Sequence, residues 1–369
     1  MVAGRVVPSA EFNFDLSTGL FLVLARRPEP RQPGRMTATF PFAPDRPVSL
    51  AQVHADGISL RQWRKPDLQR VTPGVRRLSP PATVRDKALA FDLAIGYPYA
   101  FSHLTSWCLH DLPLPDVYGS YWTLDVMRPT ADGRCERAGC RGRRGLEIRE
   151  VVKRRGLPLV GIADTWVDLG ELQRPALTRE DLIIAGDAAV LALERLVIKA
   201  EEGTPEFEEE LAQMSAARWE QEHGLGPGPQ VPDGRALLRE ALAGRTRPRG
   251  ARLLADAVGQ VRSRVRSPME TRARLRIVED GIEEPETGCE VPVATGWVGE
   301  FDLGWRDQKV LAEYQGAPHG TLQSREADRN KRQLVEDEDW EVIEIYARDI
   351  YQPGPRADLM RRIRAALNR

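Results

Sequence analysis

Long apolar runs are missing from this chain. A membrane-spanning helix needs about 18 to 20 uninterrupted apolar residues, and the longest candidate, GLFLVLA at 19–25, is far shorter. The amino terminus also lacks a basic stretch followed by an apolar core and a small-residue cleavage site, so export is not indicated. We therefore expect a cytoplasmic protein that has no membrane partner.

Cysteine is scarce, with four residues in a chain of 369. Only Cys135 and Cys140, in CERAGC, are close in sequence, and so few cysteines cannot form a disulfide framework. A zinc site would need two further ligands, yet no matching pair of cysteines or histidines stands nearby. Two interpretations stay open for this stretch, a structural zinc site and an Arg/Gly-rich surface hairpin.

An excess of one charge is also missing. The formal net charge is −1, which excludes a uniformly basic nucleic-acid-binding protein. Basic residues are nevertheless clustered in three stretches: RGRRGLEIREVVKRRG at 141–156, GRTRPRGARL at 244–253 and VRSRVRSPMETRARLR at 261–276. Each cluster fits either a contact with nucleic acid or a solvated helix face or loop.

The length and composition that are present predict two or three compact units. Hydrophobic residues make up 41% of the chain and charged residues 29%, as in a globular protein. Residues 1–46 are rich in Pro and Arg and are expected to be poorly ordered. Residues 201–234 are acidic and rich in Pro and Gly, which is typical of a linker or insertion. Two modules remain, 47–200 and 235–369.

The first module begins with a pattern of helix, turn, helix and hairpin. In PVSLAQVHADGISLRQWRKPDLQRVTPGVRRLS, Ser49 and Ser59 are potential N-caps of two short helices that Gly57 separates. This is the layout of a winged helix, although Pro66 is unfavourable inside a recognition helix. A helix pair without DNA binding is the alternative. As a DNA reader, the module would present these cations from its second helix and wing: Arg61, Arg64, Lys65, Arg76 and Arg77.

The rest of the first module mixes helices with strands. VRDKALAFDLAIG, GIADTWVDLGEL and TREDLIIAGDAAVLALERL have helical patterns, and Thr178 with Asp181 nearly matches a capping box. Alternating apolar residues in YWTLDVMRP and GLEIREVV predict two strands around an Arg-rich loop. The module is therefore expected to be of the α+β type.

The second module reads as helix, strand hairpin, helix, strand and helix. After two helices, ALLREALAG and GARLLADAVGQV, a third begins with Ser267 as N-cap and Pro268 at its first position. The strands WVGEFDLGW and KVLAEYQG follow, then a polar helix, the strand WEVIEIYA and a final helix. The sequence therefore predicts an α/β protein overall, whose C-terminal part is a mixed sheet flanked by helices.

Acidic residues near the ends of two predicted strands point to phosphodiester chemistry. Asp302 lies late on one strand and Glu313 late on the next, and a tight turn joins them. Gln315 shares a face with Glu313 because strand side chains alternate, and Glu270 on the preceding helix is a possible third acid. Carboxylates so placed could hold Mg²⁺ or Mn²⁺, which polarises a phosphoryl oxygen and activates water. The alternative is the edge of a buried strand.

Residues 267–350 resemble the very-short-patch-repair-like endonucleases of the PD-(D/E)xK superfamily. The resemblance rests on SPMETRAR, GEFDLGWRDQKVLAEYQGAPH, LQSREADRNKR and DWEVIEIYARDI, in that order. It implies that Asp302 and Glu313 bind the metal, with Glu270 as the helix acid and His319 as the histidine that follows. The sequence departs from the family at Gln315, where the family more often has Asp and the superfamily usually has Lys.

Two groups of side chains near this motif have open roles. His319 is suited to acid/base chemistry near neutral pH, or to a hydrogen bond with a backbone carbonyl. Arg329, Lys331 and Arg332 either contact phosphates or form ion pairs within an exposed charged helix.

Residues 48–198 resemble the AbiEi-type antitoxin module. The similar segments are LQRVTPGVRRL, AFSHLTSWCLHDLPLP, RRGLPLVGIADTWVDLGE and AGDAAVLA. The resemblance implies a winged helix, a role as antitoxin and transcriptional autorepressor, and a cognate toxin as partner. Ser102 and His103 match an element of that module, either as a helix cap and a packed histidine or as a catalytic pair. Asp168 is expected to be a helix or turn residue.

Two function classes follow from the sequence. The first is a metal-dependent DNA endonuclease of defence or repair type, whose N-terminal half targets or restrains it. The second is a DNA-binding regulator or antitoxin of a type IV toxin–antitoxin system, in which the nuclease fold serves only for binding.

Overall fold

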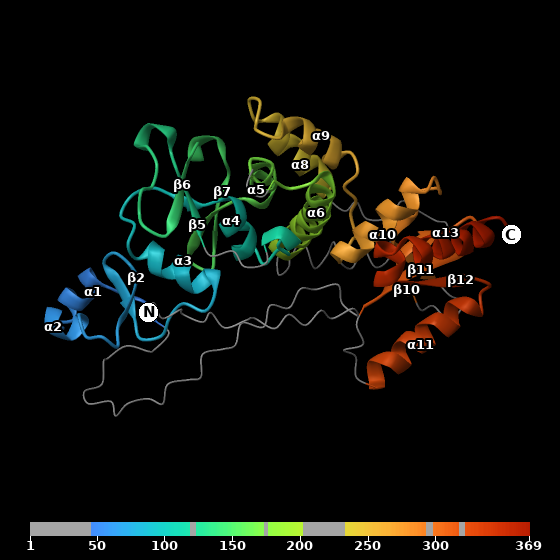
Figure 1. Cartoon of the computed structure of the whole chain (residues 1–369), viewed down its shortest axis with the longest axis horizontal. Helices are drawn as coiled ribbons and strands as arrows, with labels where there is room; N and C mark the ends of the chain where they lie inside the picture. The colour runs from blue at the N-terminus through green and yellow to red at the C-terminus, as the bar shows by residue number, and fades with distance from the viewer. Residues whose placement is uncertain (1–45, 119–122, 173–175, 202–232, 293–297, 317–321) are drawn as a thin grey trace, which may run out of the picture. The chain divides into compact units, whose positions relative to one another are not determined.

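The computed structural model describes residues 46–118, 123–172, 176–201, 233–292, 298–316 and 322–369 (Figure 1). These residues divide into two compact units, one that ends at Arg272 and one that spans Ala273–Arg369. The stretch 202–232, most of the expected linker, lies outside the described residues, as do the first 45. No helix among the residues that are described is long and apolar enough to cross a membrane.

The first unit begins with a three-stranded antiparallel sheet and two short helices. Its elements are β1 (Val48–Ser49), α1 (Leu50–Ala55), α2 (Leu60–Trp63), β2 (Gln69–Thr72) and β3 (Val75–Arg77). The strand order is β1-β3-β2. Ser49 and Ser59 cap the two helices, and Gln52 and Gln62 complete both capping boxes. The expected helix, turn, helix and hairpin is therefore present, and Pro66 lies beyond the second helix, which ends at Trp63.

A five-stranded mixed sheet follows in the same unit, in the order β6-β5-β4-β8-β7. Its strands are β4 (Ala100–Phe101), β5 (Leu124–Arg128), β6 (Cys140–Arg144), β7 (Val151–Arg154) and β8 (Leu157–Val160). The two outer pairs differ, because β5 and β6 are parallel whereas β7 and β8 are antiparallel. The Arg-rich stretch expected to be a loop therefore contains an edge strand.

Three helices accompany this sheet. They are α3 (Val84–Asp92), α4 (His103–Leu109) and α5 (Ile162–Leu169). Helices α3 and α4 contact its strands β5 and β8, and α5 contacts α4. Ala88 and Phe91 of α3 pack in a buried cluster with Phe101, Leu124 and Leu159 of the sheet. Arg137, in the loop before β6, links the turn between β2 and β3 to the segment after α3, because its guanidinium donates to the carbonyl oxygens of Pro73 and Ala94, both at 2.7 Å.

The remaining helices of the first unit form a bundle with α5. They are α6 (Arg179–Glu201), α8 (Gly234–Ala243) and α9 (Ala251–Val258). Helices α8 and α9 contact each other and α6, and α8 also contacts α5. The sequence predicts these two helices as part of the C-terminal module, 235–369. In the structure they pack within the first unit, because their apolar faces meet α5 and α6.

The second unit contains a four-stranded mixed sheet, in the order β12-β11-β10-β9. Its strands are β9 (Glu286–Pro292), β10 (Val298–Trp305), β11 (Val310–Gln315) and β12 (Glu341–Tyr346). Neighbouring strands are antiparallel except for the parallel pair β11 and β12, which α11 (Leu322–Glu336) connects. The other helices are α12 (Ala347–Tyr351), α13 (Pro353–Leu367) and the part of α10 (Pro268–Glu279) that follows Arg272. A mixed sheet flanked by helices was expected here and is confirmed.

Two elements differ from the expectation. Strand β9 pairs along β10 but was not predicted from ETGCEVP, which contains a glycine, a proline and two glutamates. In GLEIREVV, Leu146–Ile148 form a 3-10 turn after Gly145, whose φ of 103° is in the left-handed region, and β7 begins only at Val151. The glycine turn ends the pairing that the apolar alternation had suggested.

Candidate functional site

Asp302 and Glu313 occupy neighbouring antiparallel strands. The pairing of β10 with β11 includes Leu303 opposite Ala312, and one further step in the same register places Asp302 opposite Glu313. Residues directly opposite each other in an antiparallel pair point to the same face of the sheet. The Oδ2 atom of Asp302 also accepts a hydrogen bond from the backbone N–H of Tyr314, at 2.7 Å. The two carboxylates therefore belong to one face, at the same level of two adjacent strands.

A lysine from helix α11 contacts this carboxylate pair. The Nζ atom of Lys331 donates to Oε1 of Glu313 at 2.5 Å, and the same ammonium lies 4.1 Å from the centre of the Phe301 ring. Both partners of the ion pair are partly buried, at 20% and 24% exposed. A charge-assisted hydrogen bond in such a place is stronger than one at the open surface. The site therefore combines two carboxylates with one ammonium group.

A third carboxylate extends the row across the sheet. Glu344 on β12 pairs with Glu313 in the parallel register, so the two side chains share a face. Its Oε1 accepts from Arg332 at 2.9 Å, and its Oε2 accepts from the hydroxyl of Tyr346 at 2.7 Å. This hydrogen bond is the main cause of the raised pKa of Tyr346. Glu344 is thus held by its own cation and hydroxyl.

Gln315 follows Glu313 on the same face of β11. It pairs with Tyr346 of β12 and is half-buried. This register and exposure place it on the same face as Glu313 and outside the core, and a common cleft with the two carboxylates stays a prediction. The amide can donate and accept hydrogen bonds but supplies no positive charge.

The donor set suits a hard cation. Magnesium is commonly bound by one or two carboxylates together with waters and substrate phosphates, and Asp302 with Glu313 supplies two carboxylates. Among the described residues there is no group of three or more His, Cys, Asp or Glu that could hold a metal ion. These residues therefore do not form a site in which the protein alone supplies three or more ligands. A site with two carboxylates, completed by water or substrate, is compatible with them.

Glu270 performs a local task at the start of α10. Its Oε2 accepts a hydrogen bond from the backbone N–H of Arg266 at 2.8 Å, and its own N–H donates to the Ser267 hydroxyl at 3.3 Å. The expected N-cap at Ser267 is thus confirmed, and the Glu270 side chain binds the residue before the cap. Glu270 belongs to the first unit, and its role beside Asp302 and Glu313 stays a prediction. His319 lies outside the described residues.

Of the five cations expected to contact DNA, three lie on or just after helix α2. Arg61 and Arg64 are exposed and Lys65 is half-buried. The single-turn helix that carries them is anchored by the buried Trp63. Arg61 and Arg64 are therefore available to a partner without a change in the fold.

The two wing arginines are engaged inside the protein. Arg76 lies over the ring of Trp63 at 5.0 Å and donates to the carbonyl of Leu68 at 2.7 Å. Arg77 is only 3% exposed and is 3.7 Å from the carboxylate of Asp86. A DNA phosphate could not reach Arg77 in this arrangement, because β3 turns its side chain toward α3. The expected contact through Arg77 does not agree with this burial.

Ser102 and His103 belong to a buried polar cluster. The Ser102 hydroxyl lies 3.0 Å from Nδ1 of His103, and both side chains are almost completely buried. Ser102 occupies the N-cap position of α4 but makes no capping hydrogen bond. Nε2 of His103 lies 3.7 Å from Glu171, whose pKa is lowered chiefly by its interaction with this histidine. The packed-histidine interpretation is confirmed, whereas the side-chain cap is not.

Asp168 is the centre of that cluster. The carboxylate accepts hydrogen bonds from Arg149, the shortest at 2.6 Å, and lies 3.5 Å from Arg245 of the loop after α8. Arg245 also pairs with Asp164 at 2.5 Å. Asp168 is fully buried, and both arginine side chains are at least 95% buried. This aspartate is a helix residue, as expected, and it holds together three parts of the first unit.

Cys135 and Cys140 are free thiols whose sulfurs lie 3.4 Å apart. The hydrogen bond from Cys140 is the largest cause that lowers the pKa of Cys135, to about 5, and the hydroxyl of Tyr97 also donates to this sulfur. A Cβ on Gly142 would lie 2.2 Å from the carbonyl oxygen of Cys135, so only glycine permits this approach. Cys140 begins β6, which pairs in parallel with β5, so the expected surface hairpin is not formed by this stretch.

Lys331 is the site residue whose position the sequence analysis did not predict. From the sequence we expect it either at a phosphate or on an exposed helix face. In the structure its ammonium contacts Glu313 of the sheet. The available signal was the spacing to Val335, which is four residues further along α11 and fully buried. Residues four apart lie on one face of a helix, so Lys331 shares the sheet-facing side.

Comparisons with known protein families, with curated proteins and with solved structures find no match to this chain.

Proposed function

We propose that this protein is a metal-dependent DNA endonuclease of the defence or repair type, with a first unit that binds DNA. The observation that carries the proposal is the carboxylate pair Asp302 and Glu313 on neighbouring strands, with the Lys331 ammonium 2.5 Å from Glu313. Two carboxylates and one ammonium are the groups needed to bind a cation and to stabilise negative charge on a phosphodiester.

Asp302 and Glu313 would hold Mg²⁺ or Mn²⁺. When bound, the ion supplies a Lewis acid for the phosphoryl oxygen and lowers the pKa of a water. The hydrogen bond from the Tyr314 N–H orients Asp302, and the contact with Lys331 orients Glu313. Lys331 also provides, from a helix, the positive charge that Gln315 on the strand lacks. An ion pair that only fastens α11 to the sheet is the alternative role for Lys331.

A nicking assay on supercoiled plasmid DNA tests the proposal. The full chain should nick DNA with Mg²⁺ or Mn²⁺ and stop when EDTA is added. Asp302→Asn and Glu313→Gln should each lower the rate by about 100-fold or more, because each removes a direct ligand charge. Asp307→Asn is the matched control, since Asp307 is exposed in the turn between the two strands. Nicking that survives both site substitutions would refute the proposal.

Lys331→Met separates the catalytic role from the structural one. Loss of nicking with unchanged unfolding would support charge stabilisation by the ammonium. The control is Lys309→Met, because Lys309 is exposed and donates only to the carbonyl of Glu338. Equal nicking by the wild type and Lys331→Met would leave Lys331 with the ion-pair role alone.

A DNA-binding regulator or antitoxin is the second candidate function. It is favoured by the exposure of Arg61 and Arg64 on a capped helix that Trp63 anchors in the first unit. Phosphate contacts release counterions, so the affinity for DNA should fall steeply with salt. In this function a cognate toxin protein is the proposed partner, and DNA would be bound without cleavage.

Salt titrations with duplex DNA from upstream of the coding region test this candidate. Replacing Arg61 and Arg64 together by Ala should reduce the slope of log affinity against log salt by about 2. The control pair is Arg239→Ala and Arg252→Ala, which removes two exposed cations from α8 and α9. An unchanged slope in the first pair would exclude α2 as the DNA-contacting helix.

A further inference from the structure

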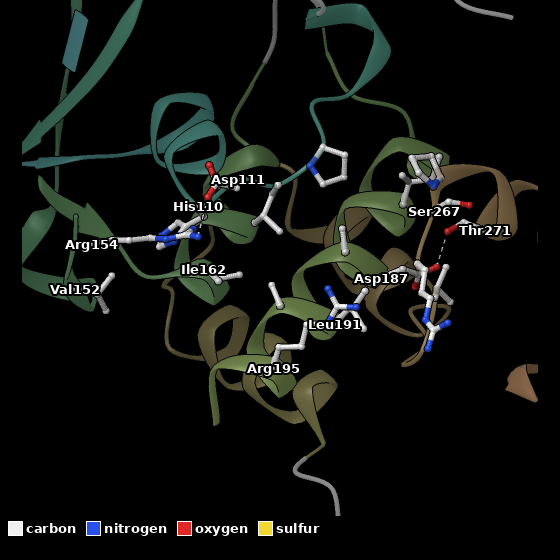
Figure 2. Close-up of a pocket in the computed structure, with 18 of the residues that line it drawn as sticks. His110, Asp111, Val152, Arg154, Ile162, Asp187, Leu191, Arg195, Ser267 and Thr271 are labelled. Carbon is white, nitrogen blue, oxygen red and sulfur yellow. Dashed lines mark hydrogen bonds and ion pairs between the residues drawn. The ribbon is translucent and has the colours of Figure 1, made fainter. Parts of the chain in front are cut away.

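A cavity of about 590 Å³ opens in the first unit beside helix α6 (Figure 2). Ligand sites for small molecules typically have volumes of about 300 to 1,000 Å³. The helix contributes residues spaced three and four apart, which form one continuous face. These are Ile184, Asp187, Ala188, Leu191, Ala192 and Arg195. The cavity therefore has one regular wall.

The lining is mainly apolar. Ile184, Ala188 and Leu191 of α6 are all half-exposed, although they lie in the middle of a long helix. Leu112 and Val265 line the cavity from the segments after α4 and before α10. A helix face of this composition normally packs against other apolar groups. An apolar molecule of suitable size would remove this surface from water.

The acidic groups of the cavity are already engaged by other groups of the protein. Asp111 accepts from Arg154 at 2.9 Å and lies 3.0 Å from Arg155. The Oδ1 of Asp187 accepts from the backbone N–H of Arg262 at 2.7 Å, and its Oδ2 accepts from the Thr271 hydroxyl at 2.8 Å. Figure 2 shows Thr271 and Asp187 joined across the cavity wall. Asp111 is therefore paired with two cations, and both carboxylate oxygens of Asp187 are held by donors of the cavity wall.

Two cations of the lining have no such compensation. Lys153 and Arg195 are exposed, and neither forms an ion pair with any residue that the structure describes. In Figure 2 the side chain of Arg195 lies beside Leu191 on the α6 wall. The cavity is consequently apolar along α6 and positive at its edge.

His110 gives the wall a polar group with a defined tautomer. Its Nε2 lies 2.9 Å from the carbonyl oxygen of Val160. A carbonyl can only accept, so Nε2 carries the proton and Nδ1 is left as an acceptor. Nδ1 has no hydrogen-bond partner in the described structure, and the ring is 94% buried. Burial lowers the pKa of His110, so the ring is neutral at physiological pH.

We propose that this cavity is a binding site for a small amphipathic anion, an apolar molecule that bears a carboxylate. The apolar face of α6 packs on the body of the ligand, while Arg195, on the same wall, binds the carboxylate. Asp111 is paired with Arg154 and Arg155, so these ion pairs weaken its repulsion of the anion. This site goes beyond the proposed function and uses none of the residues assigned to DNA or metal binding.

Calorimetric titration of the full chain with octanoate tests the proposal, with octylammonium as the ligand of opposite charge. Octanoate should bind at least about tenfold more tightly than octylammonium, which corresponds to one favourable charge interaction of moderate strength. Equal binding of the two ligands, or no saturable binding of octanoate at millimolar concentration, would overturn the proposal.

Arg195→Glu locates the anion. It should weaken octanoate binding by about tenfold, whereas Arg239→Glu, an equally exposed arginine on α8, should leave it unchanged. Ala188→Trp should abolish binding by filling the cavity, and Ala241→Trp on α8 is its control. If Ala188→Trp fails to fold, Arg195→Glu decides, because its side chain is exposed. Wild-type affinity in Arg195→Glu would contradict the assignment.

Discussion

Asp168 in the first unit is fully buried and meets Arg149 and Arg245, whereas Glu313 in the second unit is 24% exposed and meets Lys331. Both carboxylates are paired with cations, yet their surroundings differ. A buried carboxylate with two arginines cannot exchange its partners for a ligand without leaving charge in a medium of low dielectric constant. A half-exposed carboxylate can be rehydrated or can bind a different cation. The degree of burial, more than the residue type, therefore distinguishes a structural cluster from a candidate site.

Removing the buried partner should have the largest effect. Asp168→Ala removes the buried carboxylate that two buried guanidinium groups share, although Arg245 keeps Asp164 and Arg149 keeps Glu171. We expect a loss of about 3 kcal/mol in the free energy of unfolding. The measurement is chemical denaturation, followed by hydrogen exchange of peptides from α5. Asp307→Ala is the control for a surface aspartate. A loss below about 1 kcal/mol would remove the distinction between the two clusters.

The corresponding change in the second unit should have a smaller effect on stability. Glu313→Gln replaces a half-exposed ion pair by an amide, and a change of at most about 1 kcal/mol is expected. Hydrogen exchange of β11 and α11 measures this unit separately from the first. A loss as large as that of Asp168→Ala would mean that Glu313 is primarily structural.

Lowering the pH should destabilise the first unit because Glu171 becomes protonated. Its folded pKa is lowered, chiefly by His103, so the unfolded chain binds the proton more readily. The stabilisation is complete above the unfolded pKa of about 4.3 and is lost as the pH falls through the folded value. Glu171→Gln should therefore flatten the decrease of stability below about pH 4.5. Denaturation midpoints measured from pH 6 to pH 3 provide the test, and an unchanged pH profile would contradict it.

The smallest expected effect concerns one thiol. The pKa of Cys135 is lowered to about 5 mainly by the hydrogen bond from Cys140. Cys140→Ser replaces the thiol by a hydroxyl on a shorter bond, which weakens the hydrogen bond to the Cys135 sulfur. The pKa of Cys135 should therefore rise toward its usual value. The rate of alkylation by iodoacetamide as a function of pH, resolved by peptide mass spectrometry, measures this shift. Cys108, whose pKa burial raises to about 11, is the internal reference.

Much of the fold could be predicted because its signals are local. The capping boxes at Ser49 and Ser59 and the Ser267–Pro268 start of α10 depend on residues within one turn, and all three are present. The face shared by Asp302 and Glu313 also followed from strand alternation and a short turn. Local hydrogen bonding and strand period are sufficient for such features.

The features that could not be predicted depend on long-range contacts. Arg77 looked like a wing cation, but the approach of α3 buries it beside Asp86. Lys331 was expected on an exposed helix face or at a phosphate, but it forms an ion pair with Glu313 of the sheet. Strand β9 has an unfavourable composition and forms because β10 offers a partner. Each outcome was decided by residues far away in sequence, which periodicity does not report.

The centre of the five-stranded sheet is its shortest strand. β4 has two residues, Ala100 and Phe101, and it is the element that joins the pair β5 and β6 to the pair β7 and β8. The β7–β8 hairpin is local and can form within microseconds, whereas β4 must find Leu159 across more than fifty residues of chain. We therefore expect refolding in which the two outer pairs acquire structure first. Docking of Phe101 between them would then be the slow step that completes the sheet.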